Sequence, residues 1–160
     1  MIRRVQLKDA KQIVAIYNYY VLNSIVTFDK TPFAVSDFIA RIETIQEKYP
    51  FIVFEENNNI LGYAYANKWR EKPAYKRTVE STVYVKHNIH NKGIGTKLYN
   101  TLLNELRANN FHTVVGGLSL PNDASIKLHE NFGFKKVAHF KEVGFKFENW
   151  VDVGFWQLQL

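Results

Sequence analysis

A glutamate within an apolar strand is the residue whose type and position most clearly predict chemistry. The segment Thr78–Val85 reads TVESTVYV, and its alternation is typical of a β-strand. Glu80 would share one face of that strand with Thr78, Thr82 and Tyr84. A carboxylate in so apolar a segment is costly unless it is paired or faces a cleft. Glu80 is therefore either a general base in a cleft or a glutamate on a solvated sheet face.

A glycine-containing loop follows this strand and runs directly into an amphipathic helix. A loop with Gly93 and Gly95 before a helix can aim backbone N–H groups at a phosphate. A nicotinamide fingerprint is excluded because Leu98 stands at its third glycine, and a P-loop is excluded because Thr96-Lys97 has the wrong order. The loop either binds a pyrophosphate through its amides or only turns the chain tightly before the helix.

Composition narrows the class of protein. The chain has 160 residues, which fits a single domain over residues 1–160, and 46% of them are hydrophobic. It has no cysteine, and His87, His112 and His139 show no metal spacing, so we expect no metal. The net charge of +6 is scattered rather than clustered, so we expect no nucleic-acid partner. Without an apolar run long enough for a bilayer or a signal peptide, we expect no membrane partner and a cytoplasmic location.

The order of expected elements predicts an α/β (α+β) domain with a mixed sheet. Strand, helix and turn signals give the order β-α-α-β-β-β-α-β-α-β-β, which a doubly wound fold would not show. Asp9 with Gln12 and Ser36 with Asp37 are expected to cap the first two helices. The expected strands are 2–5, 51–55, 60–66, 77–85, 111–117, 134–143 and 150–159, with 118–123 as a loop and Asn122 capping a helix to about Asn131.

Several motifs together resemble one enzyme family. The strand, the loop ending in Gly93-Ile94-Gly95 and the helix resemble the acetyl-CoA loop of GNAT N-acetyltransferases, although His90 stands where the family usually has Gln or Arg. The segments TVESTVYV, GLSLPNDASIKLHENFGF and VGFKFENWVDVGFWQLQL resemble phosphinothricin N-acetyltransferases and their relatives that act on methionine sulfone and sulfoximine. The resemblance covers nearly the whole chain. It implies a GNAT fold, with a mixed, mainly antiparallel central sheet flanked by helices, and acetyl-CoA as cosubstrate.

The resemblance also implies roles for particular residues. Glu80 would act as general base, directly or through water, and a backbone N–H near Tyr84 would stabilise the oxyanion. His129 would protonate the leaving thiolate, or it is a packed helix histidine with a satisfied ring. The residues implied in acetyl-CoA binding are Val83, Tyr84, Val85, Asn91, Lys92, Gly93, Ile94, Gly95, Thr96, Asn122 and Ser125.

The acceptor implied by the resemblance is the α-amine of a small amino acid or analogue such as phosphinothricin, methionine sulfoximine or methionine sulfone. Such a substrate carries anionic groups, for which Arg70 and Lys72 are suited. The residues expected to contact it are Thr27, Phe28, Trp69, Arg70, Glu71, Lys72, Glu80, Ser81 and Thr82. A homodimer is also implied. The alternatives are acetylation of a protein N-terminus or a polyamine, and a non-catalytic domain that binds CoA or nucleic acid.

Overall fold

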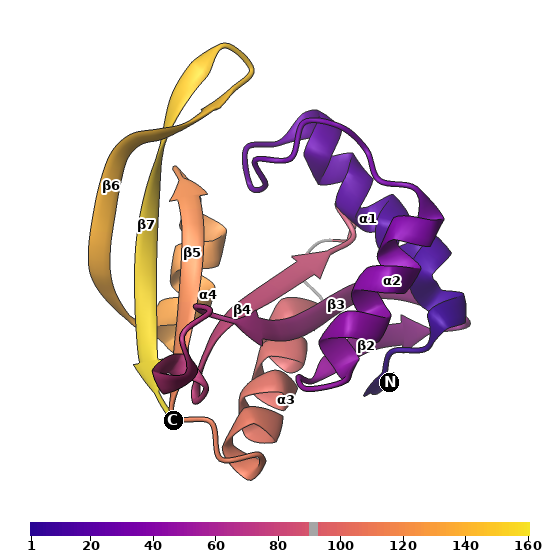
Figure 1. Ribbon diagram of the computed structural model, residues 1–160. Helices are drawn as coiled ribbons and strands as arrows, with labels where there is room; N and C mark the ends of the chain where they lie inside the picture. Colours follow the sequence, from indigo (N-terminus) through magenta and orange to yellow (C-terminus); the bar gives the residue numbers. More distant parts are fainter. Residues whose placement is uncertain (90–92) are drawn as a thin grey trace.

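The computed structural model describes residues 1–89 and 93–160, which form one seven-stranded sheet with helices on both faces (Figure 1). The strand order is β1-β2-β3-β4-β5-β7-β6. The elements are β1 (Ile2–Arg4), α1 (Ala10–Asn23), α2 (Val35–Gln46), β2 (Phe51–Glu56), β3 (Asn59–Lys68), β4 (Thr78–Val85), α3 (Ile94–Ala108), β5 (Thr113–Leu120), α4 (Asp123–Asn131), β6 (Lys135–Lys146) and β7 (Asn149–Gln159), with short 3-10 turns at Leu7–Asp9 and Pro73–Tyr75. This confirms the predicted order of helices and strands.

The sheet is split between β4 and β5, which form its parallel pair. Their pairing covers only Thr78–Glu80 against Thr113–Val115. Beyond Glu80 the two strands diverge, as Figure 1 shows, while the remaining neighbours pair antiparallel. Each strand therefore has unpaired main-chain groups along the split.

Two hydrophobic layers hold the helices against the sheet. α1 and α2 pack on one face, where Tyr63 and Tyr65 of β3 belong to the buried cluster, and α3 packs on the other with Ala64 and Ala66. This alternation follows from the two-residue period of a strand. Tyr84 joins the α1–α2 face, so Glu80 and Thr82 lie on that face as well. The shared face of β4 predicted from sequence thus faces α1 and the loop that follows it.

Gly62 of β3 is a point of close approach between β3, β4 and α3. A side-chain carbon at Gly62 would lie 2.9 Å from the carbonyl oxygen of Tyr84 and 3.1 Å from Leu98. The missing side chain lets β3 and β4 pair while α3 packs closely on the same face.

The first two helices are capped differently from the prediction, because the side chains involved bond other groups. The Asp9 carboxylate accepts from the backbone N–H of Gln6 and pairs with Arg3 at 2.7 Å. Gln12 bonds across to the Asn58 carbonyl and the Ile60 amide instead of closing a capping box. The second helix begins earlier than expected, since Asp37 accepts from the N–H of Ala34 at 2.8 Å.

The last three strands are longer than their local sequence suggested. β5 continues to Leu120, where a loop was expected from residue 118, because each residue from Thr113 onward is paired with β7. β6 continues to Lys146 rather than ending at Val143, with a register shift between Phe140 and Gly144. Cross-strand pairing therefore carries these strands past residues that read as turn formers.

Candidate functional site

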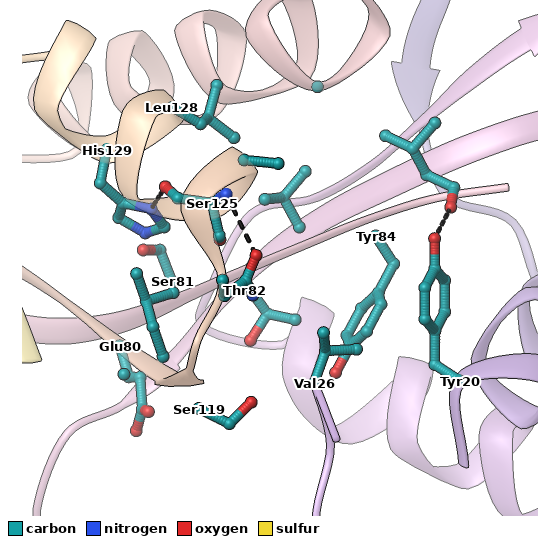
Figure 2. A pocket seen from close by; sticks show the side chains of 17 residues that line it. Tyr20, Val26, Glu80, Ser81, Thr82, Tyr84, Ser119, Ser125, Leu128 and His129 are labelled. Carbon is teal, nitrogen blue, oxygen red and sulfur yellow. Dashed lines mark hydrogen bonds between the residues drawn. The ribbon is translucent and has the colours of Figure 1, made fainter. Parts of the chain in front are cut away.

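Three adjoining cavities follow the split between β4 and β5. The middle one has a volume of about 390 Å³ and is drawn in Figure 2. A cavity of about 410 Å³ shares Val85, Gly95 and Leu128 with it, and a cavity of about 150 Å³ shares Glu80 and Ser119. The three together form one continuous path from the N-terminus of α3 to Glu80.

Glu80 faces this path, as predicted for a base in a cleft. A side-chain carbon placed at Gly117 of β5 would lie only 3.3 Å from Glu80 Oε1, so glycine leaves room for the carboxylate. Burial raises the pKa of Glu80 above its ordinary value of 4.5, while the charge of Arg70 lowers it. A carboxylate with a raised pKa is a stronger base toward an ammonium group than an exposed one.

The register of β3 and β4 decides which peptide groups are open to the split. Tyr84 pairs with Tyr63, Lys86 N donates to Leu61 O, and the Tyr84 carbonyl points at Gly62. In an antiparallel ladder these groups alternate sides, so the peptide groups of Val83 and Val85 point into the split. The Val85 carbonyl accepts from the Tyr20 hydroxyl at 2.5 Å (Figure 2). An oxyanion donor near Tyr84 would by this geometry be an amide of Val83 or Val85.

The side chain of Tyr84 is partly buried among other aromatic rings and lines the 390 Å³ cavity. It lies 5.3 Å, centroid to centroid, from both Tyr17 and Tyr20, and 5.6 Å from Tyr63. Burial raises the pKa of the Tyr84 phenol well above its usual value, so the hydroxyl stays protonated. Its side chain supports the wall of the cavity.

The glycine loop meets the N-terminus of α3 at the far end of the path. Gly93 adopts φ +62°, a conformation that favours glycine, and the 410 Å³ cavity is lined by Gly93, Ile94, Gly95 and Thr96. The predicted ligands Asn91 and Lys92, with His90, lie outside the described residues. Asn122 caps α4 by accepting from the Ser125 amide at 3.2 Å, and both residues line the 390 Å³ cavity.

His129 lies on the inner face of α4 with its ring nearly enclosed. Its Nδ1 lies 2.7 Å from the Ser125 carbonyl, which can only accept, so Nδ1 carries a hydrogen (Figure 2). Nε2 abuts β5, where a side-chain carbon at Gly116 would lie 2.4 Å away. Burial lowers the pKa of His129. This geometry favours a neutral, packed histidine over a charged proton donor.

The predicted acceptor-binding residues fall into two groups. In the first group, Phe28 and Glu80 line the 150 Å³ cavity, whereas Ser81 and Thr82 line the 390 Å³ cavity. Trp69 packs edge-on against Phe155, a residue of the cavity lining, with 5.8 Å between ring centroids. Thr27, Arg70, Glu71 and Lys72 do not line these cavities in the described part of the chain. Thr27 bonds the Tyr17 hydroxyl at 2.7 Å, and Glu71 pairs with Lys68.

A buried lysine ties the loop between α1 and α2 to the β6–β7 hairpin. Lys146 Nζ donates to the carbonyls of Ser24 at 2.6 Å and Thr27 at 2.8 Å, and Lys146 is 2% exposed. Beside it the Phe28 ring lies against Gly144, where a side-chain carbon would come within 2.2 Å of the ring. These contacts position Phe28 at the Glu80 end of the path.

The contribution of β5 and β7 to this end was not predicted from the sequence. Gly117, Ser119, Val153 and Phe155 line the 150 Å³ cavity with Ile25 and Val26. Their alternation with buried residues of the opposite face, such as Leu118 and Trp156, was visible in the sequence. This alternation did not lead to a prediction for β5, because residues 118–123 were interpreted as a loop.

Comparison with known proteins identifies the family. Residues 2–154 match the family described as the Acetyltransferase (GNAT) domain. The chain is 39% identical to phosphinothricin N-acetyltransferase of Streptomyces viridochromogenes, over 98% of this chain and 85% of that protein. It is 38% identical to L-methionine sulfoximine/L-methionine sulfone acetyltransferase of Salmonella typhimurium, over 99% and 94% of the two chains. A GNAT superfamily phosphinothricin acetyltransferase from Sinorhizobium meliloti, solved in complex with acetyl-CoA, matches with a TM-score of 0.96 and 32% identity, over 100% of this chain and 88% of that chain.

The chain therefore belongs to the GNAT N-acetyltransferases. It is an acetyl-CoA-dependent N-acetyltransferase, which confirms the fold, the enzyme class and the cosubstrate predicted from sequence. In the described ranges, no set of three histidine or carboxylate side chains is grouped as a metal site would require. No described helix combines the length and apolarity that crossing a membrane requires.

Proposed function

We propose that the enzyme acetylates the α-amine of a small amino acid or analogue, of the kind represented by phosphinothricin, methionine sulfoximine and methionine sulfone. The observation that carries this proposal is the 150 Å³ cavity at Glu80. It is small, its walls are largely apolar, and it adjoins the longer path along β4. The full-length similarity to the relatives from Streptomyces and Salmonella supports the same class of acceptor.

Glu80 is proposed to remove the proton that keeps the amine from attacking. An ammonium with a pKa two or three units above the working pH costs roughly 3–4 kcal/mol to deprotonate. Glu80 takes that proton directly or through water, and the amine nitrogen then bonds the acetyl carbon. The developing oxyanion would be held by an open amide of Val83 or Val85. Acetyl-CoA supplies the acetyl group as a thioester, whose C–S bond breaks. The sulfur leaves as a thiol with the second proton that the nitrogen loses in becoming an amide.

A homodimer and a cytoplasmic location remain part of this proposal. The β6–β7 hairpin exposes an apolar surface, here called the hairpin surface, which consists of Val137, Phe140, Val143, Phe145, Phe147 and Trp150. Exposed apolar patches of this kind mark association sites more often than free surface. Light scattering after size-exclusion chromatography should give twice the chain mass of 18.7 kDa, and a monomer at every concentration would contradict the dimer.

The acceptor is tested by thiol release from acetyl-CoA with a panel of amines. We expect turnover with phosphinothricin, methionine sulfoximine or methionine sulfone, and far less with spermidine or a peptide N-terminus. Turnover of the peptide or polyamine alone would contradict the proposed acceptor. No thiol release with any amine, together with steeply salt-dependent DNA binding, would instead indicate a nucleic-acid-binding domain.

A Glu80→Gln variant separates the role of the base from binding. The variant should still bind acetyl-CoA, measured by calorimetry, because the amide keeps the shape of the side chain. Its kcat should fall by about 10²-fold or more, the usual contribution of a positioned base. An unchanged kcat would remove Glu80 from the mechanism.

A further inference from the structure

Ser119 of β5 has a buried hydroxyl that the fold leaves without a partner. The residue is 8% exposed. Within residues 1–89 and 93–160, the buried side-chain oxygens that lack a hydrogen bond are Ser119 Oγ and Glu105 Oε2. Glu105 Oε2 is neutralised by Arg4 at 2.6 Å, so the hydroxyl of Ser119 is left unmatched. Leaving a buried hydroxyl unpaired is costly, which indicates that something else supplies its partner.

The hydroxyl lies at the acceptor end of the path, beside the proposed base. Ser119 is two residues beyond Gly117 on β5, so the two positions share a face, and Glu80 Oε1 approaches that face at Gly117. Ser119 and Glu80 both line the 390 Å³ cavity and the 150 Å³ cavity. Figure 2 shows them next to each other, apart from Ser125 and His129.

The remaining walls of the smaller cavity offer little to a polar group. Apart from Glu80 and Ser119, the described side chains that line it are apolar: Ile25, Val26, Phe28, Val153 and Phe155. The Glu80 carboxylate attracts an ammonium and repels the carboxylate of a substrate, and the Ser119 hydroxyl beside it can accept a hydrogen bond from an amine. The amine end of the acceptor therefore belongs between Glu80 and Ser119.

We propose that Ser119 accepts a hydrogen bond from the amino group of the acceptor and so directs the nitrogen lone pair. This assignment rests on the proposed function, since it needs an amine in the Glu80 cavity. An ammonium has three N–H groups, of which Glu80 removes one proton, directly or through water. Ser119 holds a second N–H, so the freed lone pair points to the acetyl carbon. Its contribution is to orientation, and the proton balance of the reaction is unchanged.

The test compares Ser119→Ala with the wild type, using the best amine of the panel and its Nα-methyl derivative. Removing the hydroxyl should lower kcat/KM for the primary amine by about 10-fold and leave KM for acetyl-CoA unchanged. The preference for the primary over the Nα-methyl amine should also fall, because the variant no longer recognises the second N–H. Ser119→Thr, which keeps a hydroxyl, should retain more activity than Ser119→Ala.

The matched control is Ser36→Ala, which removes an exposed hydroxyl on α2 and should behave as wild type. Ser119→Cys keeps the side-chain volume with a weaker hydrogen bond and provides the same comparison should Ser119→Ala fold poorly. If the wild type turns over the amine and Ser119→Ala has the same kcat/KM, or loses kcat/KM equally for both amines, the assignment of Ser119 is overturned and the proposed function stands. Absence of turnover by the wild type with every amine would overturn the proposed function and the assignment with it.

Discussion

The two ends of the cavity path are built from different parts of the chain. The main-chain groups of the donor end are the open peptides of Val83 and Val85 and the N-terminus of α3 at residues 93–96, and side chains of α4 complete its wall. The acceptor end consists of side chains from β4, β5, β7 and the loop after α1. Backbone recognition fixes the common cosubstrate, whereas separate side chains can change one at a time. The acceptor end is therefore where the specificity of the enzyme should be encoded.

The largest effect on catalysis is expected at the acceptor end, from substitution of Glu80. Burial raises the pKa of Glu80. As pH falls, kcat/KM for the amine should therefore decrease when Glu80 becomes protonated, at a pH above the usual carboxylate range. The pH profile of Glu80→Gln should lack that decrease and keep only the ionisation of the amine. Identical profile shapes for the two proteins would show that Glu80 does not titrate in the reaction.

The same raised pKa predicts a gain in stability for Glu80→Gln. A carboxyl with a folded pKa above its unfolded value stabilises the fold below the unfolded pKa and loses that contribution as pH rises through the folded pKa. At pH 7 the ionised Glu80 thus disfavours folding, and the neutral amide should raise Tm. Near pH 3 the two Tm values should converge.

A middle-sized effect is expected from Lys146, which holds the acceptor wall without touching the cavity path. Lys146→Met leaves the carbonyls of Ser24 and Thr27 without their donor, which should destabilise the fold by about 1–3 kcal/mol. Release of the loop that carries Phe28 should raise KM for the amine by about 10-fold, with little change in KM for acetyl-CoA.

Lys135→Met, at an exposed position of the same strand, is the control for Lys146 and should leave both constants unchanged. Lys146→Arg keeps the charge and should recover part of the loss. Equal increases in both KM values for Lys146→Met would show that the two ends are not independent.

The smallest effect is expected from a side chain at the donor end. Thr96 lines the 410 Å³ cavity at the start of α3. We expect the backbone amides and the helix dipole there to contribute more than this side chain to binding the pyrophosphate of acetyl-CoA. Thr96→Ala should therefore change KM for acetyl-CoA by less than about 3-fold, measured by thiol release. A loss comparable to that of Lys146→Met would show that side chains matter equally at both ends.

The donor end was predictable from sequence because its signals are local. Gly93 was recognised from its position before a helix, and Glu80 of the acceptor end was placed on the correct face by the equally local alternation of TVESTVYV. The acceptor end was harder, since Phe28 meets Gly144 and Ser119 joins Glu80 only after distant segments pair. Lys146 gave no signal at all, because it lay beyond the expected end of its strand and a lysine there usually faces solvent. Arg70 and Lys72, whose side chains suit an anion, are not among the residues that line the three cavities, although the charge of Arg70 lowers the pKa of Glu80.

The divergence of β4 from β5 places unsatisfied main-chain groups in the middle of a sheet. At a rim such groups invite another polypeptide to add a strand, which leads to aggregation. Here helices flank the opening on both faces, and the hydroxyl of Tyr20 already occupies the Val85 carbonyl. The enzyme thus keeps a template for pairing that its own architecture shields from neighbouring proteins.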